Sequence, residues 1–360
     1  MSHAAQRRGP FLCRASSVAE LISVTDALLE RNRHGDAPFT VSDWVKHRST
    51  GRHLSALLSV PRSHILRAAS GPALVGLCMS ILLGVYEELR PDSWPAPPHV
   101  SLSLLSLTAG TLSLLVVFRT NTSFQRFDEA RRLCGVLVNR SRDLNRAVAA
   151  SAVSQSAGAA CARWCGALGV TCRMHLREAV PWSLAAPPVA LAELLSATEL
   201  AALAAAVHRP LFCLQVLTGL VVNSGADVAM LRSVDEDLKA LGDAFGGCER
   251  ILRTPIPLSY TKLTSRFLAL WLLLLPFGLW NELGWEGCLF TPVLTILLYA
   301  LDEIAIELEE PFSLLPLEVF SHKMAREAAQ LHSGGAAVRA LLAEQGVLEE
   351  ADARSGAALN

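Results

Sequence analysis

Residues 100–132 read VSLSLLSLTAGTLSLLVVFRTNTSFQRFDEARR, and this stretch decides the fold. Its first half, Val100 to Phe118, has no charged residue and is long enough to cross a bilayer as a helix. Its second half turns basic and polar within a few residues. The stretch therefore predicts a transmembrane helix that continues into a polar segment.

One face of this predicted helix combines small, hydroxylated and apolar side chains. Small residues let transmembrane helices pack closely, and an uncharged face also suits the lining of a pore. The spacing alone leaves both interpretations, helix packing and pore lining, equally open. The residues that share this face at helical spacing are Ser103, Leu107, Gly110, Thr111, Leu114 and Phe118.

The composition indicates a protein that lies partly in lipid and partly in water. The chain has 360 residues, of which 51% are hydrophobic and 18% charged. The formal net charge of −1 gives no indication of a nucleic-acid partner. No Walker loop, dinucleotide fingerprint or G-x-S-x-G motif is present, and no His/Asp/Ser grouping suggests a catalytic site. The sequence therefore indicates no enzyme.

Three further apolar runs, Ala68–Tyr86, Phe267–Asn281 and Gly287–Leu301, bring the expected number of membrane spans to four. The last two runs have 15 residues each. As helices they reach about 22 Å, which is less than the hydrocarbon thickness of about 30 Å. We therefore expect them to extend into Leu258–Arg266 and Asp302–Glu307.

The charges of the loops orient these spans. The connections 87–99 and 281–287 carry one basic residue between them. The positive-inside rule then places both termini and residues 119–266 on the cytosolic side or its organelle equivalent. Residues 41–67, with Trp44, form a basic amphipathic arm suited to the membrane surface. The basic residues on the inner side are Arg62, Arg67, Arg119, Arg126, Lys262 and Arg266.

Residues 119–266 are polar with helical periodicity, which predicts several helices outside the bilayer. The alanine-rich stretch 185–206 is expected to be helical. Residues 235–250 are expected to form an exposed helix that ends near Gly246-Gly247 or slightly later. In the tail, we expect a break at Ser333-Gly334-Gly335.

The nine cysteines are scattered along the chain. Cys161 and Cys165 lie one helical turn apart, with Cys172 and His175 beyond them. A metal site there is one interpretation, but the C-x-x-C spacing is absent. Buried free thiols are the favoured interpretation.

Three separated blocks carry a family resemblance: FRTNTSFQRFDEARRLCG at 118–135, GCERILRTPIPLSYTKLTSRF at 247–267 and LDEIAIELEEPFSLLPLE at 301–318. In this order they resemble the bestrophin family, in particular its plant, algal and bacterial branch. The resemblance covers roughly Val41 to Phe320. It implies an all-α membrane protein with four transmembrane helices per subunit, an extramembrane helical region and a homopentameric assembly that conducts anions.

The resemblance also implies roles for single residues in a pore. It places a narrow neck at Leu107, Thr111 and Leu114, with Ser103 toward the outer end. Bestrophins often carry bulky apolar residues in the neck, and Thr111 departs from this pattern. The width of the neck and its hydration therefore stay open. In the matching segment, Ile256 forms a second constriction at the cytosolic exit.

Polar residues follow the neck directly. Arg119 and Arg126 would raise the local anion concentration in a vestibule. The alternative for each arginine taken singly is a snorkelling or ion-paired side chain. Asn121, with Thr122 and Ser123, would cap a following helix or offer donors to an anion.

Calcium is not expected. Animal bestrophins hold it partly with an acidic run after the last span, whereas here Glu309-Glu310-Pro311-Phe312 is followed by SLLPLE. Calcium takes six to eight oxygen ligands, and apolar residues scatter the acids of this region around a helix. We therefore expect no calcium clasp, no other metal and no cofactor. The acids concerned are Asp302, Glu303, Glu307, Glu309, Glu310 and Glu318.

The predicted function is an anion channel in a lipid bilayer, with chloride as the expected ion. Bicarbonate conduction and a non-conducting membrane scaffold are the alternatives. Residues 1–17 are basic and free of acids, as in organelle transit peptides, and the resemblance favours a chloroplast membrane, the thylakoid above all. The expected segments are 1–40 (transit), 41–67 (arm), 68–118 (first helix pair), 119–266 (helical region), 267–307 (second pair) and 308–360 (tail).

Overall fold

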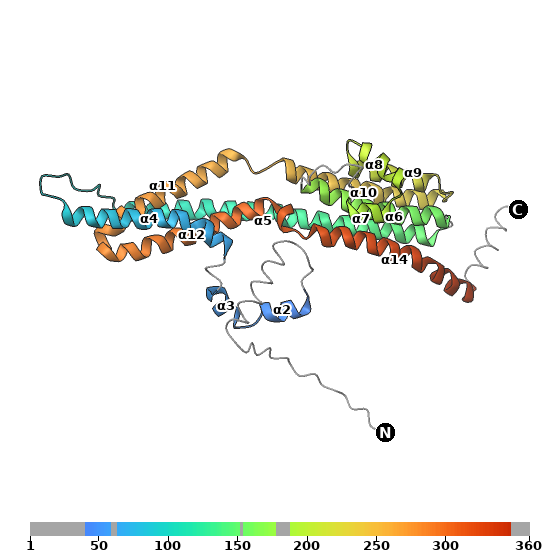
Figure 1. Cartoon of the computed structure of the whole chain (residues 1–360), viewed down its shortest axis with the longest axis horizontal. Coiled ribbons are helices and arrows are strands. Elements are labelled where there is room, and N and C mark those ends of the chain that lie inside the picture. The colour runs from blue at the N-terminus through green and yellow to red at the C-terminus, as the bar shows by residue number, and fades with distance from the viewer. Residues whose placement is uncertain (1–39, 59–62, 152–153, 178–187, 347–360) are drawn as a thin grey trace, which may run out of the picture. The chain divides into compact units, whose positions relative to one another are not determined.

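The computed structural model describes residues 40–58, 63–151, 154–177 and 188–346. The predicted transit segment lies almost wholly outside these ranges. Within them the structure is all-helical and has no strand (Figure 1). The helices are α2 (Val41–His47), α3 (Arg52–Leu58), α4 (His64–Leu89), α5 (Leu102–Ala150), α6 (Gln155–Leu176), α7 (Val189–Leu194), α8 (Ala197–Ala205), α9 (Arg209–Val222), α10 (Val228–Arg253), α11 (Leu258–Leu283), the 3₁₀ turn η2 (Gly284–Glu286), α12 (Gly287–Glu309), α13 (Pro311–Leu314) and α14 (Leu317–Glu344).

Among the described residues, three helical stretches are long and apolar enough to cross a membrane: His64–Leu89, Leu102–Ala150 and Leu258–Glu309. The last stretch contains α11, η2 and α12. α11 has 26 residues and α12 has 23, so as helices they are about 39 and 34 Å long. The predicted extension of the last two apolar runs is therefore confirmed, and each helix is long enough for a hydrocarbon core of about 30 Å.

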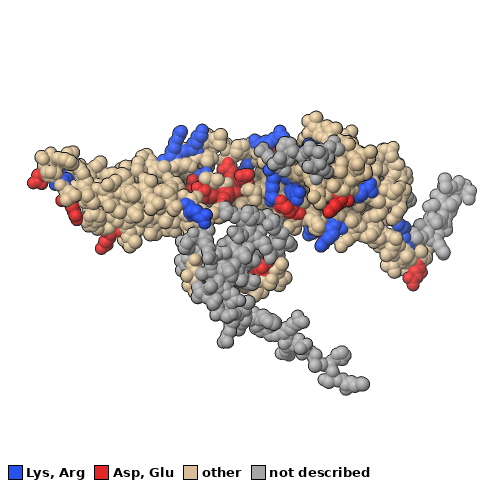
Figure 2. Space-filling model, in the orientation of Figure 1, with Lys and Arg blue, Asp and Glu red and all other residues tan. Residues whose placement is uncertain are grey.

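The chain divides into two compact units, and the first contains described residues up to Leu107 together with residues 269–303. Its helices carry few charged side chains on the face that Figure 2 shows, except at the end of the unit where α4 and α11 finish. Inside this unit the Ser80 hydroxyl lies 3.2 Å from the Thr291 hydroxyl. The Trp271 indole N–H donates to the backbone oxygen of Leu105 at 3.2 Å. These bonds satisfy polar groups between helices whose sequences are mainly apolar.

Two tryptophans pack together at the end of this unit where α11 turns into α12. The rings of Trp280 and Trp285 meet edge to face, with centroids 5.4 Å apart, and the Trp285 N–H donates to a Glu88 carboxylate oxygen at 2.7 Å. Gly284, with φ +53°, begins the turn between α11 and α12. A Cβ atom on Gly84 would lie 2.7 Å from the Trp280 ring and 2.8 Å from the Trp285 ring. Glycine at position 84 therefore lets α4 approach this aromatic pair.

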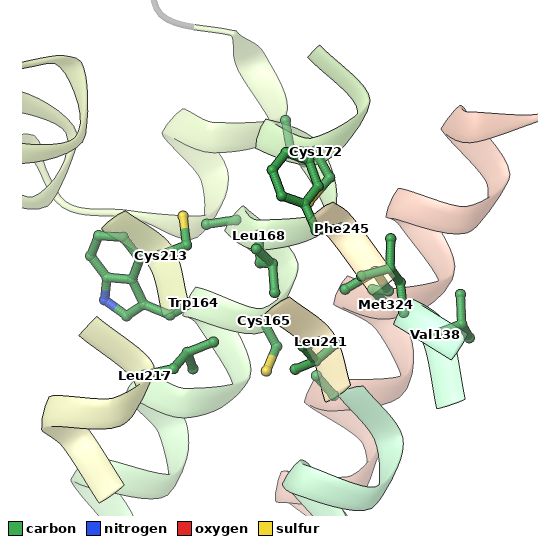
Figure 3. Close-up of a cluster of buried hydrophobic side chains, with 14 of the residues drawn as sticks. Val138, Trp164, Cys165, Leu168, Cys172, Cys213, Leu217, Leu241, Phe245 and Met324 are labelled. Carbon is green, nitrogen blue, oxygen red and sulfur yellow. The ribbon is translucent and has the colours of Figure 1, made fainter. Parts of the chain in front are cut away.

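The second unit contains residues 108–268 and 304–346 of the described chain. It is a helical bundle in which α6 packs against both α9 and α14. Its core is apolar and includes several cysteines (Figure 3). The labelled side chains come from α5 (Val138), α6 (Trp164, Cys165, Leu168, Cys172), α9 (Cys213, Leu217), α10 (Leu241, Phe245) and α14 (Met324).

Two glycine-containing stretches that were expected to end or break a helix lie inside helices, although α10 ends only three residues past the expected range 235–250. α10 continues through Gly246-Gly247 to Arg253. A Cβ atom at Gly247 would lie 2.8 Å from the Leu133 side chain, so this glycine allows close packing against α5 and does not end the helix. α14 likewise continues through residues 333–335. Its buried face, which includes Met324 and Ala328, packs in the bundle, and this burial outweighs the low helix propensity of two glycines.

The alanine-rich stretch 185–206 also differs from a single helix. Its described part forms two short helices, α7 and α8. Ser196 accepts a hydrogen bond from the Glu199 backbone N–H, and the Glu199 carboxylate accepts one from the Ser196 backbone N–H. This capping box starts a new helix within the stretch. The predicted division of the chain into six segments remains a prediction.

Replacing Gly84 with alanine is expected to destabilise the first unit by about 1–3 kcal/mol, because the new methyl group overlaps two packed indole rings. Thermal unfolding of the detergent-solubilised protein, followed by helical circular dichroism, would measure the loss. The control is Gly71→Ala on the same helix, where a Cβ atom meets nothing within 4 Å. Equal melting temperatures for the two variants would contradict the close packing of Gly84 against the two tryptophans.

Candidate functional site

The candidate site is the uncharged face of α5, a single helix of 49 residues. At 1.5 Å per residue, α5 is about 74 Å long, more than twice a hydrocarbon thickness. Its opposite face is buried within the chain, as Leu105, Leu112 and Val116 are 5% exposed or less. The four predicted neck residues Ser103, Leu107, Thr111 and Leu114 are all exposed, Leu107 at 78% and Leu114 at 54%.

This exposure agrees with a face that meets a lumen, a neighbouring subunit or lipid. Leu104 and Val117, which lie beside that face, are also exposed at 56% and 53%. Exposure alone therefore does not separate the predicted neck from its neighbours on the helix. The neck assignment remains a prediction that the geometry permits.

Asn121, Thr122 and Ser123 do not begin a new helix, which corrects the expectation that they cap one. α5 runs through them without a break. The Thr122 hydroxyl donates to the Phe118 backbone oxygen at 2.9 Å, so it is accommodated inside the helix. Asn121 is exposed and lies two turns after Leu114 on the same face, where its amide remains a candidate donor to an anion.

Arg119 is buried inside its own chain, at 1% exposure. Its guanidinium Nη1 donates to the Ser265 hydroxyl at 3.2 Å. One helical turn earlier, the backbone oxygen of Leu115 accepts a hydrogen bond from the Tyr260 hydroxyl at 3.3 Å. These bonds join α5 to the beginning of α11 where the apolar sequence ends. A direct role of Arg119 in attracting anions remains a prediction.

Arg126 joins the ends of two helices to α5. Its guanidinium donates to the backbone oxygens of Ile251 at 2.7 Å, Thr254 at 2.6 Å and Glu309 at 3.2 Å. The last carbonyl groups of a helix have no partner within it and carry partial negative charge. One cation therefore stabilises the ends of both α10 and α12. Anion attraction by Arg126 remains a prediction beside this structural role.

The predicted second constriction lies in the segment that Arg126 holds. The Ile256 N–H donates to a Glu309 carboxylate oxygen at 3.1 Å. The Ile256 side chain is buried at 5% exposure, whereas Pro255 and Pro257 are exposed. A side chain that lines a lumen has to be exposed in the isolated subunit, so this burial does not favour Ile256 as a constriction. Its role stays a prediction.

The cysteines of α6 are buried free thiols, as predicted. Cys161, Cys165 and Cys172 are 1%, 0% and 3% exposed. Burial raises the pKa of Cys161 to about 12 and that of Cys165 to about 11, so both thiols stay protonated and unreactive at neutral pH. His175 does not join them. It meets His208 and Glu249 instead, a grouping from three helices that no local motif in the sequence signals.

The acidic residues near the end of α12 also take structural partners. Glu309 bonds to the Ile256 N–H, and Glu318 on α14 forms an ion pair with Arg177 within the same chain. Arg177 also donates to the backbone oxygens of Phe312 at 3.1 Å and Leu315 at 2.9 Å. The contacts of Arg177 fix the connection between α12 and α14, whereas Glu309 holds the segment between α10 and α11. The expectation that they form no calcium clasp remains a prediction.

Comparison with known proteins identifies the family. The family described as Bacterial/Fungal Bestrophin protein matches residues 43–330. The chain belongs to the bestrophin family. It is 29% identical to the Voltage-dependent chloride channel 2, chloroplastic, of Arabidopsis thaliana over 299 residues, which are 78% of this chain and 69% of that protein. It is 32% identical over 280 residues to a voltage-dependent anion channel-forming protein of Nostoc sp., covering 72% and 84% of the two chains.

Solved structures agree with this fold. A crystal structure of a bacterial bestrophin homologue from Klebsiella pneumoniae aligns with a TM-score of 0.66 at 23% sequence identity, covering 74% of this chain and 99% of that one. A second crystal structure of that homologue aligns with a TM-score of 0.65 at 24% identity, covering 73% and 98%. The predicted bestrophin resemblance is thus confirmed.

Replacing Arg126 with alanine is expected to destabilise this bestrophin by about 1.5–3 kcal/mol, because three carbonyl groups lose a charged donor. Thermal unfolding in detergent would measure the loss. Arg131→Ala is the matched control on α5, since Arg131 is 67% exposed and makes only a 4.0 Å ion pair with Asp128. Its effect should stay within about 0.5 kcal/mol. An unchanged Arg126→Ala melting temperature would contradict the structural role.

Proposed function

We propose that this bestrophin is an anion channel formed by five copies of the chain, with chloride as the ion that it conducts. Family membership supports the class of protein, and the names of the relatives in Arabidopsis and Nostoc support anion conduction. The observation that carries the proposal is the exposed, uncharged face of α5. In the proposed pentamer this face lines a common axis.

Four helices per subunit cross the membrane in this proposal: α4, α5, α11 and α12. The lengths of α11 and α12 support separate spans, joined by the short turn at Gly284. Only the first part of α5 lies in lipid, and its polar second half continues into water.

The proposed neck selects by size and dipoles, because it offers no charge. Leu107 and Leu114 narrow the path and limit hydration, while the hydroxyls of Ser103 and Thr111 donate to an anion that has lost water. A carboxylate in the neck would repel anions, and the first half of α5 has none. Thr111 places a hydroxyl between two leucines, which makes this neck wetter than one lined by apolar residues alone.

The proposed location is a chloroplast membrane, with the thylakoid as the specific membrane. Two relatives in Arabidopsis thaliana are named chloroplastic. The basic, acid-poor residues at 1–17 have a composition that agrees with this address. By the positive-inside rule, residues 119–266 then face the stroma.

Replacing Leu107 with alanine is expected to change the anion conductance by about twofold or more, because it widens and wets the neck. The measurement is the single-channel current of purified protein in planar bilayers. Val117→Ala is the control, because Val117 is exposed at 53% but lies about 80° away around the helix. Equal conductance changes in the two variants would contradict a neck at Leu107.

Reversal potentials in the same bilayers would identify the ion. A shift on replacing chloride by bicarbonate that shows preference for chloride supports the proposal, and preference for bicarbonate replaces the proposed ion. A folded pentamer without any current would overturn the channel in favour of a membrane scaffold.

A further inference from the structure

Three metal-ligating side chains from separate helices meet in the second unit, away from the face of α5. His175 lies at the end of α6, His208 is the N-cap residue of α9, and Glu249 lies in the last part of α10. Within the part of the chain that the structure describes, this is the one group of histidine, cysteine and acidic side chains with atoms close enough to share a metal ion.

The distances between these ligand atoms suit a small cation. His175 Nε2 lies 2.8 Å and His208 Nε2 lies 3.0 Å from the same Glu249 oxygen, Oε1. One atom from each of the three side chains falls within 4.8 Å of the others. Zinc bonds of about 2.0–2.2 Å in a tetrahedron separate neighbouring ligands by about 3.3 Å. The two distances to Glu249 would lengthen by a few tenths of an ångström around an ion, and ligand atoms that lie up to 4.8 Å apart would move closer together.

We propose that His175, His208 and Glu249 form a binding site for a divalent transition metal, zinc in particular. Two imidazole nitrogens and one carboxylate oxygen supply three ligands, and a water molecule completes the tetrahedron. Calcium and magnesium prefer six or more oxygen ligands, so this donor set selects against them. The site is independent of the proposed channel activity.

The surroundings hold the ligands in place and leave access for an ion. The Phe245 ring contacts both imidazoles edge to face, at centroid distances of 5.4 Å to His175 and 5.8 Å to His208. All three ligands are partly exposed, with side-chain exposures of 22–29%. An ion and its water can thus reach the site from solvent, while the helices fix the three attachment points.

Burial lowers the pKa of His175, and the neutral imidazole is the form that binds a metal. His208 Nδ1 faces the Leu211 N–H at 3.4 Å, a long contact. Metal binding at Nε2 would place the ring proton on Nδ1, which would cost this long hydrogen bond.

The arginine beside the site, Arg253, can move away from it. Arg253 Nη2 lies 3.9 Å from the Glu249 carboxylate, and the Arg253 side chain is 69% exposed. A cation bound by Glu249 would displace this weak, solvated ion pair with small loss. In exchange, the metal would link α6, α9 and α10 close to the end of α10.

The test uses the full chain in detergent, freed of metal with a chelator and then titrated with zinc chloride. We expect one zinc ion bound per chain. X-ray absorption at the zinc edge should show nitrogen and oxygen ligands at about 2.0–2.2 Å and no sulfur shell at about 2.3 Å. A sulfur shell would place the ion on the cysteines, and failure to bind zinc would also overturn the proposal.

Variants then assign the ligands. His208→Ala and Glu249→Gln should each weaken zinc binding by about tenfold or more. His322→Ala, at an exposed position of α14, is the matched control and should bind zinc as the native chain does. Glu249→Gln keeps the size of the side chain, so it remains informative if the histidine variant fails to fold. Unchanged zinc affinity in Glu249→Gln and His208→Ala would exclude this site.

Discussion

The constraint on which the rest of the structure depends is the change of solvent along α5. A helix in hydrocarbon has to satisfy its backbone polar groups internally, and α5 does so without interruption for 49 residues. Because the helix continues past Phe118, the helix that carries the uncharged face also contributes to the core of the second unit, through residues such as Leu144.

The arginines after this change of solvent show how sequence charge can mislead. Arg119 and Arg126 have the composition and position expected for an anion vestibule, yet both guanidinium groups bond within the chain. Arg126 satisfies carbonyl groups at the ends of α10 and α12 that would otherwise lack partners. An arginine with such structural partners still contributes to the electrostatic potential nearby, but its removal would first lower the stability of the fold.

The sequence was sufficient for features that depend on composition over many residues. The apolar runs, the four long helices that contain them and the helical character of residues 119–266 all follow from hydropathy and periodicity. The new helix start at Ser196 and the continuation of α10 past Gly247 did not, because a reciprocal cap decides the first and tertiary packing, such as the contact with Leu133, supports the second. The cluster around Glu249 was out of reach for the same reason, since its members lie on three helices and form no local motif.

Exposed apolar side chains on α5 have different meanings in its two halves. Leu107 in the apolar half is 78% exposed, and either lipid or a lumen can surround it at little cost. Phe124 in the polar half is 56% exposed, and lipid is not available to cover it there. A single exposed aromatic residue in water is ordinary, and Phe124 lies about 120° around the helix from Phe118, so it does not continue the uncharged face. Asn121, which is exposed on the same side of the helix as Leu114, does continue that face into the polar half. A water-filled lumen in the proposed channel would meet the face in both halves.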